Sequence, residues 1–341
     1  MKNLIRPRPA AAMVAVIAVV GGAAGVAAGQ GKAAAAHPHG HAKLEHGALI
    51  VKGTRAADSI ALRLKAGDPD VVQVDFADDG SADFSFDRRG VERIAVKARA
   101  GDDRVRIDES NGAFTNDIPT TIDGGDGNDT LSGGSGAETL IGGDGNDLVD
   151  GNASNDVAFL GAGDDTFVWD PGDGSDTIEG GDGADTMRFN GANAAEQVVL
   201  SANGNRLRFF RTQGNITMDT AGVETVDFNA LGGADLVTVD DLTGTGVNAV
   251  DVDLAGTLGG TTGDGQPDQV VVNGTNGDDA VNVRGAAGSV RVGGLAAETE
   301  LLHSEPGDRL DINTLDGQDG VDSGGLAAGT IQLFVDGVLV P

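Results

Sequence analysis

The stretch from Gly124 to Arg188 reads GGDGNDTLS GGSGAETLI GGDGNDLVD GNASNDVAF LGAGDDTFV WD PGDGSDTIE GGDGADTMR. It contains seven nine-residue units, with a two-residue insertion (Trp169-Asp170) before the sixth. A disordered linker would have no reason to keep acids and apolar residues in phase, so the pattern predicts an ordered repeat. The sixth position of each unit is acidic, and the seven acids are Asp129, Glu138, Asp147, Asp156, Asp165, Asp176 and Asp185. The eighth position is apolar, and these residues are Leu131, Leu140, Val149, Ala158, Phe167, Ile178 and Met187.

Each unit has two halves with different physical roles. The first six residues are rich in Gly, Asp and Asn, which tolerate the positive φ angles of tight turns. The last three residues suffice only for a very short strand, which is stable when neighbouring coils stack on it at the sheet spacing of about 4.8 Å. We expect two units to form one coil, so that the turns of units n and n+2 lie directly above one another.

Stacked turns would bring carboxylates together. Asp129 and Asp147 are one coil apart and are expected to face one gap, as are Asp126 and Asp144. Their like charges would push the coils apart. A calcium ion, which takes about six to eight oxygen ligands, would offset this repulsion with help from carbonyl oxygens of the turns. We therefore expect calcium binding and folding to be one coupled event.

The units match the pattern unequally. The first and third are full matches, the fourth has lost two glycines, the fifth begins with Leu160, and the longer Glu138 stands in the second. We expect about three to five calcium ions. The predicted ligands are turn acids and turn glycines, namely Asp126, Asp129, Asp144, Asp147, Asp156, Asp165, Asp173, Asp176, Asp182, Asp185, Gly124, Gly127, Gly142, Gly145, Gly180 and Gly183.

The units follow the nonapeptide G-G-x-G-x-D-x-U-x, and the segment resembles hemolysin-type (RTX) calcium-binding proteins. The resemblance implies an all-β fold, in which a parallel β-roll or β-solenoid of calcium-binding nonapeptides is flanked by irregular β units. RTX proteins with enzymatic or toxic activity carry that activity in a separate upstream domain. Here only roughly 75 residues separate the predicted linker from the repeats, and they have the pattern of β-strands.

The flanks contain a longer and weaker repeat. Gly90–Val96 matches Gly222–Phe228 at an offset of 132 residues, and a third copy follows near Leu310–Val321. Apolar residues alternate in these stretches, as half-buried strands require. We infer three related β units at 48–108, 197–245 and 270–324. One elongated β-solenoid and a pair of small β-sandwiches around a short β-roll both remain open.

The charge of the chain and the motifs that it lacks limit the classes of function that it can have. The 341 residues include 53 acids, 23 bases and no cysteine, which gives a net charge of −30. This charge favours cations, excludes nucleic acid as a partner and leaves the fold without disulfides. There is no H-E-x-x-H, G-x-S-x-G or phosphate-loop motif and no cysteine nucleophile, so we do not expect an enzyme.

The N-terminal residues predict export. Lys2, Arg6 and Arg8 precede the apolar run Ala10–Ala28, as in a signal peptide, which we place at residues 1–36. The mature chain has no later run of the ~20 apolar residues that a membrane span needs, so we expect a secreted protein. The remaining predicted segments are a linker at 37–47, an N-terminal β unit at 48–121, the β-roll at 122–190 and C-terminal β units at 191–341.

Three other features suggest metals more weakly. The linker histidines His37, His39, His41 and His46 are of the type that binds zinc or copper, although a flexible linker explains them as well. The turns Asp75–Asp83 and Asp264–Asp268 both contain Asp-Gly-x-x-Asp, which suits either an extra ion or a plain hairpin turn.

The sequence thus predicts a secreted calcium-binding RTX-type protein that folds into a β-roll on binding Ca²⁺ and interacts with a cell surface or matrix. Two alternatives remain: a calcium-dependent extracellular hydrolase with a groove on the solenoid face, and a passive stalk of the cell envelope.

Overall fold

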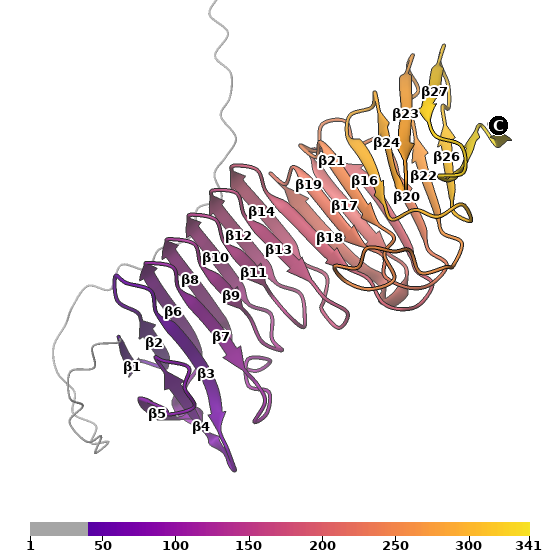
Figure 1. Cartoon of the computed structure of the whole chain (residues 1–341). Coiled ribbons are helices and arrows are strands. Elements are labelled where there is room, and N and C mark those ends of the chain that lie inside the picture. Colours follow the sequence, from indigo (N-terminus) through magenta and orange to yellow (C-terminus); the bar gives the residue numbers. More distant parts are fainter. Residues whose placement is uncertain (1–39) are drawn as a thin grey trace, which may run out of the picture. The chain divides into compact units, whose positions relative to one another are not determined.

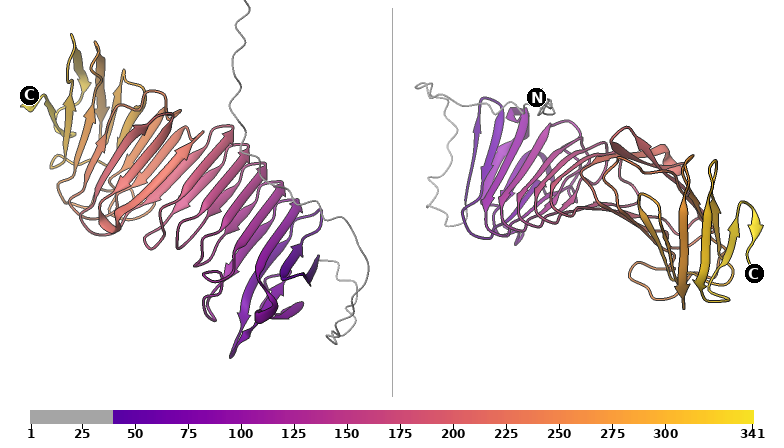
Figure 2. Two further views of the ribbon diagram at one scale, coloured as in Figure 1. Left: turned by 180° about the vertical axis from the view of Figure 1, so that it is seen from behind. Right: turned by 90° about the horizontal axis from the view of Figure 1, so that it is seen from above.

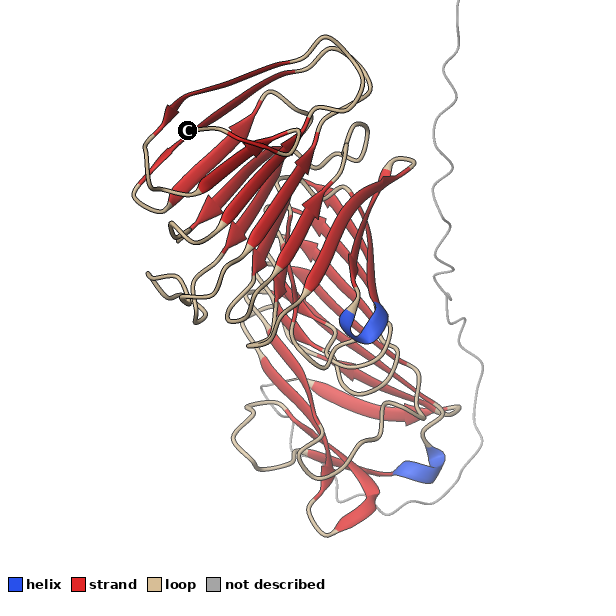
Figure 3. Ribbon diagram, turned by 90° about the vertical axis from the view of Figure 1, so that its right-hand side faces the viewer, coloured by secondary structure: helices blue, strands red, loops and turns tan. Residues whose placement is uncertain are grey.

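Two β-sheets, named here A and B, contain all the strands of the computed structural model, which describes residues 40–341. Within those residues the only helical elements are two 3-10 turns, η1 (Arg88–Gly90) and η2 (Gln213–Asn215), as Figure 3 shows. The all-β class is therefore confirmed. None of the helical turns in this range is long or apolar enough to cross a membrane.

Sheet A has 15 strands and sheet B has 14. In spatial order, sheet A consists of β1 (His41–Glu45), β2 (Ala48–Lys52), β6 (Arg93–Ala100), β8 (Thr120–Asp126), β10 (Thr139–Asp144), β12 (Val157–Ala162), β14 (Thr177–Asp182), β18 (Ile216–Ala221), β17 (Arg206–Arg211), β16 (Gln197–Asn203), β20 (Leu236–Val239), β22 (Gln269–Asn273), β26 (Arg309–Asn313), β28 (Gln332–Val335) and β29 (Val338–Leu339). Sheet B consists of β27 (Gly320–Leu326), β23 (Ala280–Ala286), β24 (Ser289–Gly293), β25 (Glu298–Leu302), β21 (Ala249–Asp253), β19 (Thr225–Asn229), β15 (Thr186–Asn190), β13 (Thr166–Trp169), β11 (Leu148–Asp150), β9 (Thr130–Ser132), β7 (Arg104–Asp108), β3 (Ser59–Lys65), β4 (Asp68–Asp75) and β5 (Phe84–Asp87).

The nonapeptide units form coils that alternate between the two sheets. The chain passes from β8 in sheet A to β9 in sheet B and returns to β10 beside β8, where Thr139 pairs in parallel with Thr121 (Figure 1). Leu148 in β11 pairs in the same way with Thr130 in β9. Each partner is 18 residues away, so two units make one coil and the turns of units n and n+2 stack, as predicted.

The apolar eighth positions form the core of the block. The side chains of all seven, from Leu131 to Met187, are fully buried between the two sheets. Inward and outward residues alternate along each short strand, as β12 and β13 illustrate with buried Ala158 and Phe167. The acid at the sixth position and the apolar residue at the eighth are two residues apart, so both side chains point into the interior.

The insertion Trp169-Asp170 is absorbed without loss of register. Thr166 pairs with Thr186 and Val157 pairs with Thr177, so the coil repeat is 20 residues here. Trp169 is the last residue of β13, where it pairs with Phe189, and Asp170 begins the turn to β14. Trp169 turns inward and stacks on Phe189, with ring centroids 3.9 Å apart. The indole nitrogen donates to the carbonyl of Gly174 at 2.8 Å, which closes the longer turn.

The flanks continue both sheets, as the two views of Figure 2 show for the strands on either side of the block. Parallel pairs such as β6–β8 and β15–β19 join flank to block. Antiparallel excursions at β3–β5, β16–β18 and β23–β25 interrupt the coils. These are the irregular units, and the coils enclose one hydrophobic core that runs from Ala42 to Leu333.

Both ends of the block are continuous with the flanks. The predicted boundary at 121/122 falls inside β8, because this strand pairs both with β6 of the flank and with β10 of the block. The matching flank sequences also lie in opposite sheets, Gly90–Val96 leading into β6 of sheet A and Gly222–Phe228 into β19 of sheet B. The flank repeat therefore corresponds to a turn followed by a strand, and that strand can belong to either sheet.

The predicted linker 37–47 is wrong over part of its length. His41–Glu45 forms β1, which pairs antiparallel with β2 through a turn at His46 and Gly47. The pairing is favourable because Ala42 becomes buried against the core at the edge of sheet A. His41 lies edge-on to Phe84, with centroids 5.9 Å apart. The signal peptide at 1–36, His37 and His39 lie outside the described residues.

The aromatic cluster at the C-terminal end of the block gives a test of the core. Phe189 contacts the rings of Trp169, Phe209 and Phe228 at centroid distances of 3.9, 4.4 and 6.0 Å. We expect Phe189→Ala to lower the free energy of unfolding by about 3–5 kcal/mol, because it leaves a cavity where two sheets and an excursion meet. Urea denaturation in saturating calcium measures this loss. An unchanged midpoint would show that the cluster does not join block and flank.

Candidate calcium-binding turns

The sixth-position acids lie in two rows, one along each edge of the coils. The row formed by turns from sheet A to sheet B, the A-to-B row, contains Asp129, Asp147, Asp165 and Asp185. The row formed by the return turns, the B-to-A row, contains Glu138, Asp156 and Asp176. All seven side chains are buried, with exposed fractions of 3% or less. Buried carboxylates are rare unless they are paired or bind a metal.

In six of the seven acids one carboxylate oxygen joins adjacent coils, whereas Glu138 Oε2 accepts the Gly134 N–H within its own turn at 2.8 Å. The backbone N–H of Asp129 donates to Asp147 Oδ1 at 2.7 Å, and that of Asp147 donates to Asp165 Oδ1 at 2.7 Å. Asp165 and Asp185 continue this arrangement at 3.0 Å, across the insertion. The B-to-A row has equivalent bonds from Glu138 to Asp156 at 2.7 Å and from Asp156 to Asp176 at 2.8 Å. We call these bonds the carboxylate ladder.

The second oxygen is left without a protein partner in most of these acids. It is buried and accepts no hydrogen bond from any described residue in Asp129, Glu138, Asp147, Asp156, Asp165 and Asp185. A buried acceptor without a partner costs about 1–3 kcal/mol, and more when it is charged. Because the same oxygen is orphaned in coil after coil, the arrangement fits a group that is absent from the polypeptide itself.

Glycines make room beside each orphaned oxygen. A Cβ atom on Gly124 would lie 2.2 Å from Asp129 Oδ2 and 2.7 Å from the carbonyl oxygen of Gly142 in the next coil. A Cβ on Gly142 would likewise lie 2.4 Å from Asp147 Oδ2 and 2.3 Å from the carbonyl oxygen of Leu160. A carboxylate oxygen and a carbonyl oxygen of consecutive coils therefore converge on one spot, which only a residue without a Cβ leaves open.

The donor set suits calcium. Calcium prefers carboxylate and carbonyl oxygens and tolerates irregular geometry, and both kinds of oxygen line the turns. Across residues 40–341, no three acidic or imidazole side chains gather into a metal site by themselves. A cation here would therefore take most of its ligands from turn carbonyls, with a single carboxylate oxygen from each coil.

The electrostatics of the ladder also favour a cation. Burial, reinforced by neighbouring carboxylates, raises the pKa of Asp129 to about 6 and that of Asp147 to about 7. Burial raises the pKa of Asp156 to about 9 and that of Asp176 to about 7. The ladder hydrogen bonds lower these values but do not cancel the effect of burial. A divalent ion at the orphaned oxygen would stabilise the charged form.

The structure separates the predicted ligands into groups. Gly124, Gly142 and Gly180 lie beside the carboxylates, and Gly127, Gly145 and Gly183 have positive φ and stack on the turn below. Asp173 is half-buried and accepts the Asp170 N–H at 2.6 Å, and burial raises its pKa to about 6. Asp126, Asp144 and Asp182 have exposed side chains. Asp126 and Asp144 pair in register on neighbouring coils, and a gap shared by their carboxylates stays a prediction.

Sequence reasoning missed the extension of the ladder beyond the block. The Asp103 N–H donates to Asp129 Oδ1 at 2.7 Å, and the Asp185 N–H donates to Glu224 Oε2 at 2.8 Å. Their separations in sequence, 26 and 39 residues, differ from the coil repeat of 18. A search for a fixed period overlooks them, although the acidic Gly turn at 100–103 was a local signal.

The two other candidate turns have protein partners instead of an open cation site. Asp75 is fully buried, forms a 2.7 Å ion pair with Arg63 and accepts the Gly80 N–H at 2.9 Å. Asp264 accepts N–H groups from Gly233 and Gln266, each at 2.7 Å. Both Asp-Gly sequences thus act as turns that are stabilised by side-chain to backbone hydrogen bonds.

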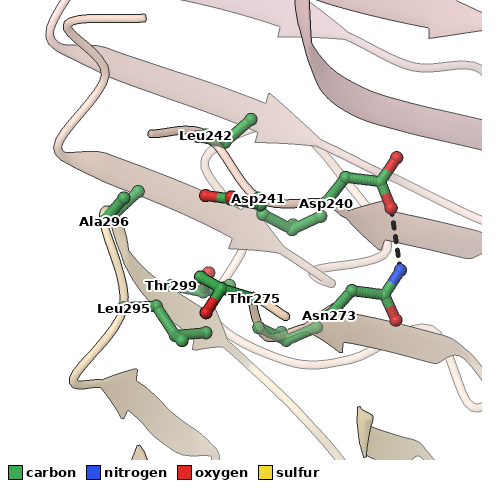
Figure 4. Close-up of a pocket in the computed structure, with 11 residues that line it drawn as sticks. Asp240, Asp241, Leu242, Asn273, Thr275, Leu295, Ala296 and Thr299 are labelled. Atoms are coloured by element: carbon green, nitrogen blue, oxygen red, sulfur yellow. Dashed lines mark hydrogen bonds between the residues drawn. The ribbon is translucent and has the colours of Figure 1, made fainter. Parts of the chain in front are cut away.

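A pocket beside β20 and β22 is too small for an organic substrate. Asp240, Asp241, Asn273 and Thr299 are among its lining residues, and Asn273 Nδ2 donates to Asp240 Oδ1 at 2.7 Å (Figure 4). Its cavity volume of about 10 Å³ accommodates roughly one water molecule.

Comparison with known proteins agrees with the geometry of the turns. The model of the RTX calcium-binding nonapeptide repeat matches four copies, at residues 121–137, 132–167 and 172–193. The central segment thus matches the RTX calcium-binding nonapeptide repeat, and such repeats imply calcium binding. Among curated proteins no match to the chain is found.

The glycine stacking gives a test with a matched control. Gly143 has φ of 126°, and a Cβ there would lie 1.9 Å from the Gly125 carbonyl oxygen, whereas Gly204 has φ of 68° and open space around it. We expect Gly204→Ala to cost about 1 kcal/mol of unfolding free energy, since only its φ is unfavourable. Gly143→Ala should cost about 3 kcal/mol or more and weaken calcium binding. Equal losses in urea denaturation would refute the importance of close turn stacking.

The raised pKa values predict how pH acts on the calcium-free chain. The unfolded chain loses these protons near pH ~4, whereas Asp129, Asp147 and Asp156 keep theirs to about 6, 7 and 9 when folded. The folded state binds more protons in this window, so its stability falls as pH rises. With a chelator, the β signal in circular dichroism should resist urea better at about pH 5 than at about pH 8.

Excess calcium should abolish or reverse this dependence, because the ion replaces the protons on the carboxylates. A chelated chain that is equally stable at both pH values would contradict the role assigned to the buried acids.

Proposed function

We propose that this protein is secreted and that calcium outside the cell completes its fold. The observation that carries the proposal is the repeated orphaned oxygen, buried in coil after coil beside a glycine that leaves space for an ion. Without the ion, the folded chain must keep these acids protonated or leave buried charges uncompensated. With the ion, the same oxygens become ligands, so metal binding supplies folding free energy.

Charge and redox chemistry support a role outside the cell. The net charge of −30 opposes compaction of the chain where calcium is scarce, and divalent ions in the stacked turns reduce that repulsion. The chain has no cysteine, so calcium takes the part that disulfides play in many exported proteins. A chain that stays unfolded before export and folds afterwards suits passage through a secretion channel.

The folded product would serve interaction with a cell surface or matrix. Its coils alternate between two sheets whose outward positions carry many polar residues, among them Thr130, Thr166 and Thr186 in sheet B. Long ladders of backbone hydrogen bonds make such coils stiff, because each strand is held by neighbours on both sides. A rigid, acidic, calcium-dependent element is a suitable scaffold for contacts that form only outside the cell.

The proposal is tested by an ion count on two variants of the same coil. Asp147→Asn keeps the oxygen that accepts the Asp129 N–H but replaces the orphaned oxygen by an amide nitrogen, which does not ligate calcium. Asp144→Asn makes the same change of charge at an exposed side chain. Native mass spectrometry in saturating calcium should find about one ion fewer in Asp147→Asn and the wild-type number in Asp144→Asn.

Calcium titrations followed by circular dichroism accompany the count. Asp147→Asn should require more calcium to reach the full β signal than Asp144→Asn. If the wild-type chain gained its β structure equally in calcium and in chelator, coupled folding would be rejected even if ions were bound.

A further inference from the structure

Two turns outside the matched repeats combine the backbone conformation of the calcium turns with a buried acid at the sixth position. They are residues 98–103, which span the end of β6 and the turn to β7, and residues 230–235, between β19 and β20. In the calcium turn 124–129, the second and fourth residues have φ of 114° and 128°. The same two positions have positive φ in both flanking turns: 100° and 109° at Arg99 and Gly101, and 66° and 140° at Leu231 and Gly233. Positive φ is uncommon for Arg and Leu, so the stacking of the turns imposes this conformation.

Each of these turns ends in an acid of the carboxylate ladder. The Asp58 N–H donates to Asp103 Oδ1 at 2.7 Å, and Asp103 in turn donates its N–H to Asp129. On the other edge, the Glu196 N–H donates to Asp235 Oδ1 at 2.7 Å. Asp103 and Asp235 therefore hold the same position relative to their neighbouring coils as Asp147 does in the block.

The second oxygen of both acids is buried and has no partner. Asp103 is 2% exposed and Asp235 is 3% exposed, and Oδ2 of each accepts no hydrogen bond within residues 40–341. The flanks satisfy other ladder acids: Asp308 Oδ2 accepts the Glu305 N–H at 2.6 Å, and Asp279 Oδ2 accepts the Thr275 N–H at 2.7 Å. Turn 314–319 has the same positive φ at Leu315 and Gly317, but its acid, Asp319, is only partly buried. In the flanks, the orphaned oxygen thus occurs where the calcium-turn conformation is combined with a fully buried acid, as at Asp103 and Asp235.

Carbonyl oxygens also face the gap next to Asp103. A Cβ on Gly125 or Gly127 in the following coil would lie 1.9 Å from the Arg99 carbonyl oxygen or 2.3 Å from the Gly101 carbonyl oxygen. Inside the block, a Cβ on Gly143 would lie 1.9 Å from the Gly125 carbonyl oxygen, and one on Gly145 would lie 2.3 Å from that of Gly127. The gap after Asp103 thus has the same oxygen lining as the gap after Asp129.

We propose that the turns ending at Asp103 and Asp235 are additional calcium sites, which extend the ion rows beyond the nonapeptide block. The orphaned Oδ2 of each acid is the side-chain ligand, and carbonyl oxygens of the stacked turns supply the rest. The proposal rests on calcium binding by the block. Ala98 and Ala230 are fully buried and stand where Gly124 stands in the block, so each turn has a methyl group at the position that glycine leaves open there. These two sites therefore bind calcium more weakly than those of the block.

The test counts calcium ions on the full chain by native mass spectrometry in saturating calcium. Asp103→Asn and Asp235→Asn keep the ladder acceptor and remove the orphaned oxygen, so each should bind one ion fewer than the wild type. Asp308→Asn, a ladder acid whose two oxygens both accept N–H groups, should bind the wild-type number. Wild-type counts in both Asp103→Asn and Asp235→Asn would overturn the proposal.

The Asp147→Asn variant distinguishes this proposal from the proposed function. An ion lost there but at neither flank turn rejects only the flank sites, whereas no loss at any of the three rejects both proposals. Should a flank variant fail to fold, anomalous diffraction from calcium in crystals of the unmodified chain decides the matter. A peak within about 2.3–2.6 Å of Asp103 Oδ2 is the expected result. Peaks at Asp129 and Asp147 with none at Asp103 or Asp235 would reject the flank sites.

Discussion

The bond from a backbone N–H to the carboxylate of the next coil is the interaction on which the rest of the structure depends. It places one acid per turn inside the molecule, at a fixed height in the stack, and it occupies only one of the two carboxylate oxygens. The other oxygen is thereby held in a dry site where charge is costly. The carboxylate ladder that joins the coils thus also leaves buried oxygens whose charge a bound cation would stabilise.

Glycine makes this arrangement possible in two ways. At the first turn position, the missing Cβ lets the carboxylate and the carbonyl of the next coil approach the same spot, as at Gly124. At the second and fourth positions, positive φ brings carbonyl oxygens of one turn against the next, as at Gly143 and Gly145. Turns that lack some of these glycines, such as 98–103, still have positive φ at the second and fourth positions, even where Arg99 replaces glycine.

The sequence pattern predicted the structure best at positions where the residue type allows only one location for the side chain. Apolar eighth positions such as Leu131 are in the core because an alternating strand leaves no other place for them. The exposed position of Asp126 was not predictable in the same way, since both it and Asp129 are aspartates of one Gly-rich turn. The direction of a turn side chain depends on backbone angles, which the composition of the turn does not specify.

The sequence by itself determined the nine-residue period, the two-unit coil, the buried eighth position and the use of calcium, because these follow from spacing and donor chemistry within one coil. Only the tertiary structure decided that β1 extends sheet A, that the flanks share the core of the block, and that Asp103, Glu224 and Asp235 join the ladders. Those contacts join residues separated by insertions of irregular length. The spacing of residues in the sequence therefore does not predict these contacts, because the hydrogen bonds between coils alone set the register.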